Sequence, residues 1–330
     1  MGILEDLWSA ISCDSGSSQP AYMRQYKEER KYSLGSADGS PEPTLTQADG
    51  IALHGEGSEQ RMAVTSLSDH CVYIVNVASG ERMATCGSEA KMPEDGPPPL
   101  EFPPGQFFRI SGAAFSSAGE LYAGDEMLCR IQVFDKAGAF LRSIGGPGTE
   151  EGQFRGPGGL AFTADGKLVV ADTGNGRVQI FREDGTFVRA FGTQGGRDGE
   201  FDGPTDVCVA PDGSIAVTDT GNCRVQVFDE EGKFVSSIGG VEGRGRGMFL
   251  YPWAVAAGGG GEIIVCDRNR GDLQIFKNKG GELLQIIGEG GDSDLKLGYT
   301  DTMERFPHFV AADAGGQIFV TVGCYVKKLA

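Results

Sequence analysis

The strongest constraint on the fold of this chain is a long internal repeat. Residues 152–195 and 199–240 are near copies of each other, and Phe154 and Phe201 occupy the same place in the two copies, 47 positions apart. Each copy contains four short β-prone runs separated by Asp-Gly or Glu-Gly pairs. A unit of this length and pattern is typical of a four-stranded antiparallel blade of a β-propeller.

The repeat extends in both directions from these two copies. Phe107 and Phe249 mark two further copies, and weaker ones start near Thr46 and at Phe306. The sequence therefore predicts an all-β fold, a six-bladed β-propeller of four-stranded antiparallel blades. This prediction concerns the scaffold, and many unrelated functions use the same scaffold.

The last copy supplies only three strands. Residues 31–35 resemble the segment that closes the fourth copy, so we expect them to form the outermost strand of the last blade, beside residues 324–329. A ring closed in this way has no open sheet edge. Residues 27–330 are thus predicted to form the propeller, and residues 1–26 an N-terminal tail with a short amphipathic helix.

The turns of each copy predict two different faces of the ring. We label the four strands of a copy a to d in chain order. The a–b and c–d connections are predicted to be tight hairpins, because their glycines accept the positive φ that such turns need. Propeller geometry places these hairpins on one face, which we call the hairpin face, and the d–a and b–c connections on the other, which we call the loop face. Propellers usually bind their partners on the loop face.

The b–c connections of the two clearest copies carry the same polar side chains at the same spacing. An Asp or Asn that opens a turn bonds nearby backbone, and an Arg close to it pairs with the carboxylate. We predict that these side chains have a structural role, because a catalytic residue is needed once and not in every blade. The residues are Asp172, Asn175 and Arg177 in one copy and Asp219, Asn222 and Arg224 in the next.

This passage resembles the hallmark of the NHL-repeat family, D-x-x-N-x-R-[IV]-Q-x-F, and the resemblance covers residues 27–330. One enzyme of that family, a lyase that cleaves peptidyl-hydroxyglycine, holds zinc with histidines that follow the strand-a proline. Only one of the six equivalent positions here is a histidine, so we predict a protein that is not an enzyme and that uses no metal and no cofactor. The six positions are Asp49, Ser111, Gly158, Thr205, Trp253 and His308.

NHL domains of tripartite-motif proteins suggest two binding functions, RNA recognition by a basic loop face and substrate selection for ubiquitin ligases. We predict a non-catalytic scaffold that binds a protein partner, as a substrate-selecting or adaptor component in ubiquitination. The alternative function is RNA binding, and a lyase-like enzyme is the minor alternative. Arginines beside aromatic residues indicate the interface. The predicted binding residues are Arg244, Arg246, Tyr251, Trp253, Arg268 and Arg270, with Arg155 and Arg197 in neighbouring blades.

Composition narrows the class of partner. The formal charge is −17 and the pI is about 4.6, which argues against binding to DNA or to an anionic membrane. The eight cysteines form no C-x-x-C pair, and we find no secretory signal and no run long enough to span a bilayer. We therefore expect a cytoplasmic monomer.

Overall fold

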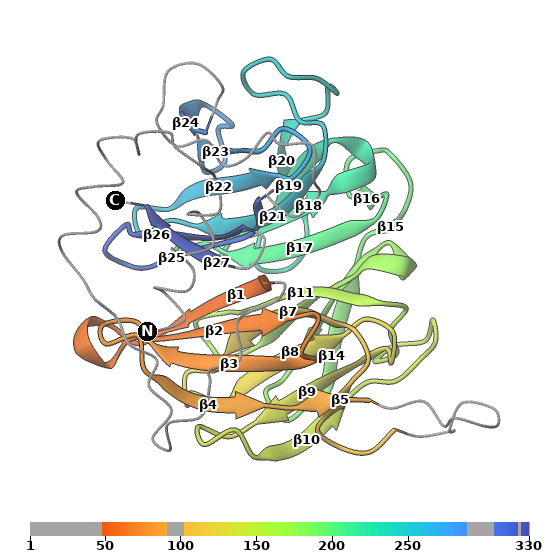
Figure 1. The fold of residues 1–330 in the computed structure, drawn as a ribbon. Helices are drawn as coiled ribbons and strands as arrows, with labels where there is room; N and C mark the ends of the chain where they lie inside the picture. The colour runs from red at the N-terminus through yellow and green to blue at the C-terminus, as the bar shows by residue number, and fades with distance from the viewer. Residues whose placement is uncertain (1–47, 91–101, 289–306, 323–324, 330) are drawn as a thin grey trace.

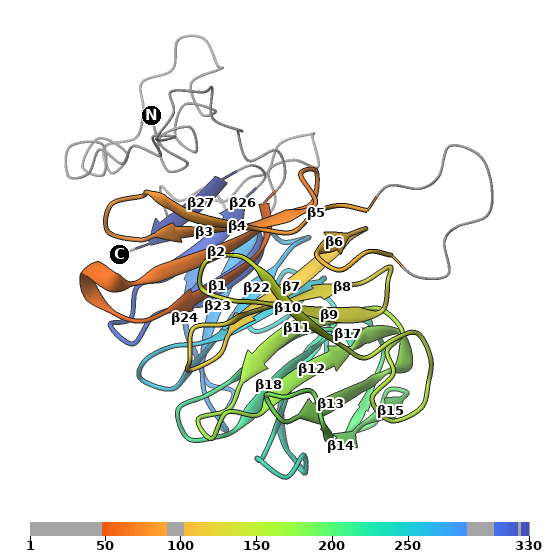
Figure 2. The same cartoon turned by 90° about the horizontal axis from the view of Figure 1, so that it is seen from below.

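The computed structural model is an all-β propeller of six blades, as the repeat predicts (Figure 1). It describes residues 48–90, 102–288, 307–322 and 325–329. Six antiparallel sheets follow one another around a ring, each running from an inner strand a outward (Figure 2). The inner strands a are β1 (Ala48–His54), β7 (Ile110–Phe115), β11 (Pro157–Phe162), β17 (Pro204–Val209), β21 (Pro252–Ala257) and β25 (Pro307–Ala312).

The remaining strands of each blade pair in chain order. Strands b are β2 (Arg61–Ser66), β8 (Leu121–Asp125), β12 (Leu168–Asp172), β18 (Ile215–Asp219), β22 (Glu262–Asp267) and β26 (Ile318–Val322). Strands c are β3 (Cys71–Asn76), β9 (Arg130–Phe134), β13 (Arg177–Phe181), β19 (Arg224–Phe228), β23 (Asp272–Lys277) and β27 (Tyr325–Leu329). Strands d are β4 (Arg82–Cys86), β10 (Phe140–Ile144), β14 (Phe187–Phe191), β20 (Phe234–Gly239) and β24 (Leu283–Ile287).

The sixth blade has three strands among the described residues, in the order β25-β26-β27. Residues 31–35, which we expect to pair with the outer edge of β27, lie outside the described residues, as does the helix expected within residues 1–26. The terminal blades meet directly, because β1 packs against β25. Across this seam the Thr321 hydroxyl donates to the Asp49 carbonyl at 2.7 Å, and His308 Nδ1 lies 3.0 Å from Asp49 Oδ1.

A phenylalanine in the d–a connections that lead into blades 2 to 5 anchors the core between blades. Phe154 and Phe201 are fully buried, and each ring packs on the phenylalanine that ends strand c of its own blade, with centroids 5.5 Å apart in both cases. The turn before this residue needs glycine. Gly192 has φ +87°, and a Cβ there would lie 2.4 Å from the Phe201 ring.

Short elements complete the d–a and b–c connections. Two-residue parallel pairs join β5 (Ser88–Glu89) to β6 (Gln106–Phe107) and β15 (Thr193–Gln194) to β16 (Glu200–Phe201). Among the described residues, the 3₁₀ turns η3 (Thr173–Asn175) and η4 (Thr220–Asn222) lie in b–c connections, and η2 (Gly57–Glu59) lies in the a–b connection of blade 1. Within the described ranges, no helix is long and apolar enough to cross a membrane.

Candidate binding surface

A buried aspartate at the end of strand b organises the loop face in blade 4. Asp219 is 0 % exposed and accepts hydrogen bonds from Arg224 Nε at 2.7 Å and from the Asp202 backbone N–H at 2.7 Å. Asn222 Nδ2 also donates to this carboxylate, at 3.0 Å. Arg224 in turn donates to the carbonyls of residues 197 and 200 in the d–a connection. The aspartate and arginine therefore hold the b–c and d–a connections together.

Blade 3 repeats this arrangement residue by residue. Arg177 Nε and Asn175 Nδ2 both lie 2.8 Å from Asp172 Oδ2, and the Arg155 backbone N–H lies 2.8 Å from Asp172 Oδ1. Arg177 also donates to the carbonyls of residues 150 and 153. Because the same contacts recur in two blades and end on the protein's own backbone, these motif side chains serve the scaffold.

The glutamine of the hallmark is a second anchor, to which we had assigned no role. Gln226 is 0 % exposed, donates to the Glu200 carbonyl at 2.7 Å and accepts from the Gly199 N–H at 2.9 Å. It thereby fastens strand c to the turn before the anchoring phenylalanine. The same two contacts are made by Gln132, Gln179 and Gln274.

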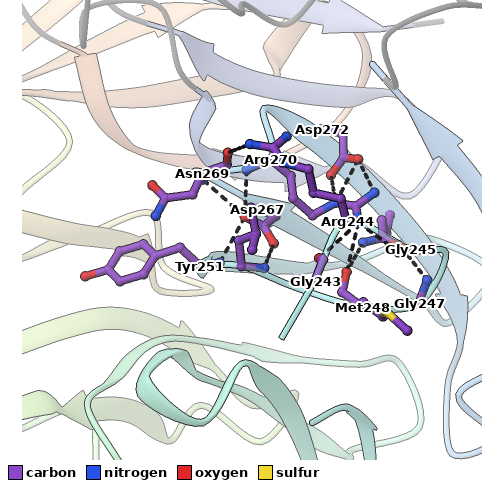
Figure 3. Close-up of polar contacts among 12 residues, drawn as sticks. Gly243, Arg244, Gly245, Gly247, Met248, Tyr251, Asp267, Asn269, Arg270 and Asp272 are labelled. Atoms are coloured by element: carbon purple, nitrogen blue, oxygen red, sulfur yellow. Dashed lines mark hydrogen bonds and ion pairs between the residues drawn. The ribbon is translucent and has the colours of Figure 1, made fainter. Parts of the chain in front are cut away.

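Blade 5 also holds its b–c and d–a connections together, but with exchanged residue types (Figure 3). Arg270 stands where blades 3 and 4 have asparagine, and Asp272 stands where they have arginine. The Arg270 guanidinium pairs with Asp272 at 2.7 Å and donates to the carbonyls of Gly243, Gly245 and Met248. One arginine therefore makes the contacts to backbone carbonyls that Asn222 and Arg224 share in blade 4.

This arrangement corrects one of our expectations. We expected Arg270 to project from the loop face, but its side chain is 3 % exposed and its donors are taken by Asp272 and by backbone carbonyls. The carboxyl of Asp267, which accepts backbone N–H groups in this blade, has a pKa raised by burial, an effect that hydrogen bonds from Leu250, Arg270 and Tyr251 partly offset.

The predicted aromatic residues of blade 5 form an ordered stack. Tyr251 and Trp253 lie nearly parallel, with ring centroids 5.5 Å apart and planes 14° apart. The Arg268 guanidinium carbon lies 5.5 Å from the Trp253 ring centroid, within the range of a cation–π contact. Trp253 follows Pro252 at the start of β21, whereas Arg268 comes from the b–c connection of the same blade. The stack therefore joins the channel rim to the loop face.

The remaining predicted arginines lie in the d–a connections. Arg244 and Arg246 are exposed on the connection that Arg270 holds from beneath, and Arg244 Nη2 donates to the Asn269 carbonyl at 3.4 Å. Arg155 and Arg197 are exposed in the corresponding connections of blades 3 and 4. The structure thus places five predicted residues on blade 5, three of them in one stack, and leaves Arg155 and Arg197 on neighbouring blades. We call the five the blade-5 patch: Arg244, Arg246, Tyr251, Trp253 and Arg268.

The ring of positions after the strand-a proline is occupied by interactions between blades. Thr205 Oγ1 donates to the Trp253 carbonyl at 2.7 Å, and Ser111 Oγ donates to the Pro157 carbonyl at 2.7 Å. His308 faces Asp49, as described above. In the part of the chain that the structure describes, no three His, Cys, Asp or Glu side chains gather closely enough to hold a metal ion.

Comparison with known proteins supports the repeat and the ring. A family model described as the NHL repeat matches residues 154–181, 201–228 and 249–276. No curated protein matches the sequence. Among solved structures, a streptogramin B lyase gives a TM-score of 0.59 at 13% identity, with 88% of this chain and 95% of that chain covered.

Two further solved structures have the same fold at similarly low identity. A virginiamycin B lyase from Staphylococcus aureus gives a TM-score of 0.56 at 13% identity, covering 87% of this chain and 86% of that one. A chain of a nidogen/laminin complex gives 0.55 at 16% identity, covering 73% of this chain and 80% of that one. These likenesses establish the architecture alone. With the family match and the six sheets, they show that the chain contains NHL repeats within a six-bladed β-propeller.

Proposed function

We propose that this propeller is a non-catalytic scaffold that binds a protein partner on its loop face, centred on the blade-5 patch. The observation that carries the proposal is the stack of Arg268, Trp253 and Tyr251. Of the five other blades, four have a small or acidic residue where Trp253 stands, and blade 6 has His308. The repeat itself therefore does not require an aromatic side chain there.

The chemistry of the patch suits a protein surface. Trp, Tyr and Arg are the residues over-represented among interface hot spots, because each combines a large apolar area with hydrogen-bonding or charge. The connection that carries Arg244 and Arg246 is ordered before binding, since Arg270 and Gln274 hold its backbone. A pre-ordered surface loses less conformational entropy on association.

The charge of the patch defines the kind of partner. Arg244, Arg246 and Arg268 give this surface three cations in a chain whose formal charge is −17. An acidic segment that also presents an apolar or aromatic group would pair with the arginines and pack against the Trp253 and Tyr251 rings. Electrostatic complementarity of this kind directs both orientation and partner choice.

Capture of partners by the wild-type chain and by the Arg244→Ala, Arg246→Ala, Trp253→Ala triple variant tests the proposal. We expect recovery of the main protein partner to fall by about tenfold or more, because truncating a hot-spot contact costs about 2 kcal/mol or more. The control is Arg182→Ala with Lys233→Ala, which removes two exposed cations from the hairpin face. Both variants should unfold within a few degrees of the wild type.

Two outcomes would contradict the proposal, one its location and the other the class of partner. Equal recovery from a folded triple variant would place the interface elsewhere, and loss of the captured partners after nuclease treatment would favour RNA instead. On the resemblance to NHL domains of tripartite-motif proteins, we also propose that the bound protein is a substrate or component in ubiquitination. Capture that contains no ubiquitin ligase and no ubiquitinated protein would remove that part of the proposal.

A further inference from the structure

The central channel contains a cavity that the loop-face interface does not use. It has a volume of about 280 Å³ and is lined by residues of all six inner strands. The lining residues lie in the C-terminal halves of the inner strands, next to the a–b hairpins. They include Leu53, Phe115, Phe162, Val209, Ala257 and Ala312. All six strands contribute apolar side chains. The cavity therefore belongs to the hairpin end of the channel, away from the blade-5 patch.

One acidic residue lies among those that line this cavity. Asp206 is the only Asp, Glu, Lys, Arg or His among the lining residues, and it is 5 % exposed. Its Oδ2 accepts the Val255 backbone N–H at 2.9 Å. Among the described residues, no ion pair with a cationic side chain involves Asp206. The carboxyl is thus buried without a positive partner, a situation that is costly for the ionised form.

The carboxyl is not a requirement of the repeat. The equivalent positions in the other blades hold uncharged residues, namely Gly50, Gly112, Gly159, Ala254 and Phe309. Gly159 in the neighbouring blade leaves the space that the carboxylate fills, since a Cβ there would lie 1.7 Å from Asp206 Oδ1. The hydrogen bond to Val255 does not need a charge either, because an asparagine oxygen would accept it equally well.

We propose that the hairpin end of the channel binds a small organic amine, with its ammonium group against Asp206 and its compact apolar body against the alkyl and aromatic walls. A buried carboxylate is stabilised by a cation that supplies both charge and hydrogen bonds. A divalent metal ion fits less well, because the lining offers a single carboxylate. The volume suits a ligand of one ring with a short chain, since an apolar cavity of about 150 Å³ accommodates benzene.

Isothermal titration with phenethylamine tests the site, with 2-phenylethanol as its neutral counterpart. We expect binding of the amine in the millimolar range or tighter, in keeping with a ligand of about nine non-hydrogen atoms. The alcohol should bind about tenfold more weakly. Asp206→Asn should reduce amine affinity by about tenfold or more and leave the alcohol unchanged, since only the charge is removed.

A second variant and a pH series keep the test decisive if Asp206→Asn does not fold. Ala161→Leu fills the cavity from blade 3 and should weaken both ligands. Burial raises the pKa of Asp206 to about 7, and the titratable groups around it are Asp49 on β1, Cys208 on β17 and Cys266 on β22. The amine stays protonated below about pH 9. Its affinity should therefore fall by about tenfold from pH 8 to about pH 5.5, as Asp206 gains a proton.

The opposite results would overturn the proposal. Equal affinity for the amine and the alcohol would show that the cavity does not distinguish a charged ligand from a neutral one. Amine binding that survives Ala161→Leu and does not change with pH would place the amine at another site. Absence of measurable amine binding to the folded wild-type chain at millimolar concentration would reject the site outright.

Discussion

At the scale of single residues, blade 5 exchanges the partners of a buried ion pair and keeps the contacts. Blade 4 holds its d–a connection with Asn222 and Arg224 around Asp219, whereas blade 5 uses Arg270 paired with Asp272. Both solutions give the backbone carbonyls of the d–a connection a cationic donor. They also leave no buried carboxylate without hydrogen bonds, which is the condition for burying such a group.

This exchange makes a prediction about paired substitutions. Arg270→Asn leaves Asp272 buried without its partner, and Asp272→Arg places two guanidinium groups side by side, so each single change should lower the free energy of unfolding by about 3 kcal/mol or more. The double variant restores the Asn and Arg pattern of blades 3 and 4. It should lie within about 1 kcal/mol of the wild type, as measured by urea unfolding.

The same double-mutant cycle can contradict this prediction. If the losses of the two single variants simply add in the double variant, residues 270 and 272 are not coupled as the contacts indicate. A matched cycle on exposed residues, Arg109→Ala with Glu126→Ala, should show little coupling, because that ion pair of 3.2 Å is solvent-exposed.

The sequence alone could not place Arg270. The exchange of residue types at positions 270 and 272 is visible in the repeat, but the direction of a long arginine side chain depends on the acceptors that surround it. Its backbone acceptors lie 22 to 27 positions earlier, in the d–a connection. Tyr251, Trp253 and Arg268 were identified correctly as neighbours, because their places in the repeat fix them at the start of strand a and in the b–c connection.

At the scale of elements, the d–a connection depends on strand c for its position. Gln274 on β23 accepts the Gly247 N–H at 2.9 Å and donates to the Met248 carbonyl at 2.8 Å. These bonds hold the segment that presents Arg244 and Arg246. A buried amide therefore supports the loop-face surface of blade 5. The glutamine belongs to the hallmark motif, but the motif does not show which backbone groups its side chain contacts.

Removing this amide should disturb binding without touching the surface. We expect Gln274→Ala to destabilise the fold by about 2 kcal/mol, since it leaves a buried N–H and a carbonyl without partners. It should also lower partner capture severalfold, because Arg244 and Arg246 lose their fixed position. Thermal unfolding and the capture assay on the same preparation measure both effects.

Blade 2 provides a matched control for this variant. Gln132 is equally buried, accepts the Gly105 N–H at 2.8 Å and donates to the Gln106 carbonyl at 2.8 Å. Gln132→Ala should therefore cost similar stability but leave capture unchanged. Equal loss of capture in both variants would mean that binding follows overall stability rather than the position of the blade-5 connection.

At the scale of the whole molecule, the repeat was sufficient to predict the ring of six blades. Completion of blade 6 by residues 31–35 remains a prediction. The period of the phenylalanines and the turn glycines identified the blades, because blades 2 to 5 share the same buried anchor and positive-φ turns recur around the ring. At the seam between β1 and β25, the Thr321 contact repeats one made by Thr218, whereas the His308–Asp49 pair combines side chains that the other four blades do not have at this position. Such contacts between the first and last copies cannot be read from the period.

The last prediction concerns the strand that completes blade 6. Among the described residues, β27 has β26 on one side only, so its other edge needs a partner. If residues 31–35 supply it, deletion of residues 1–36 should expose that edge and cause aggregation or a large loss of stability, whereas deletion of residues 1–24 should be tolerated. Size-exclusion chromatography and urea unfolding of the two truncated chains give the comparison. Because both deletions remove the tail and only one removes the strand, equal behaviour would show that another segment closes the blade or that β27 remains an edge.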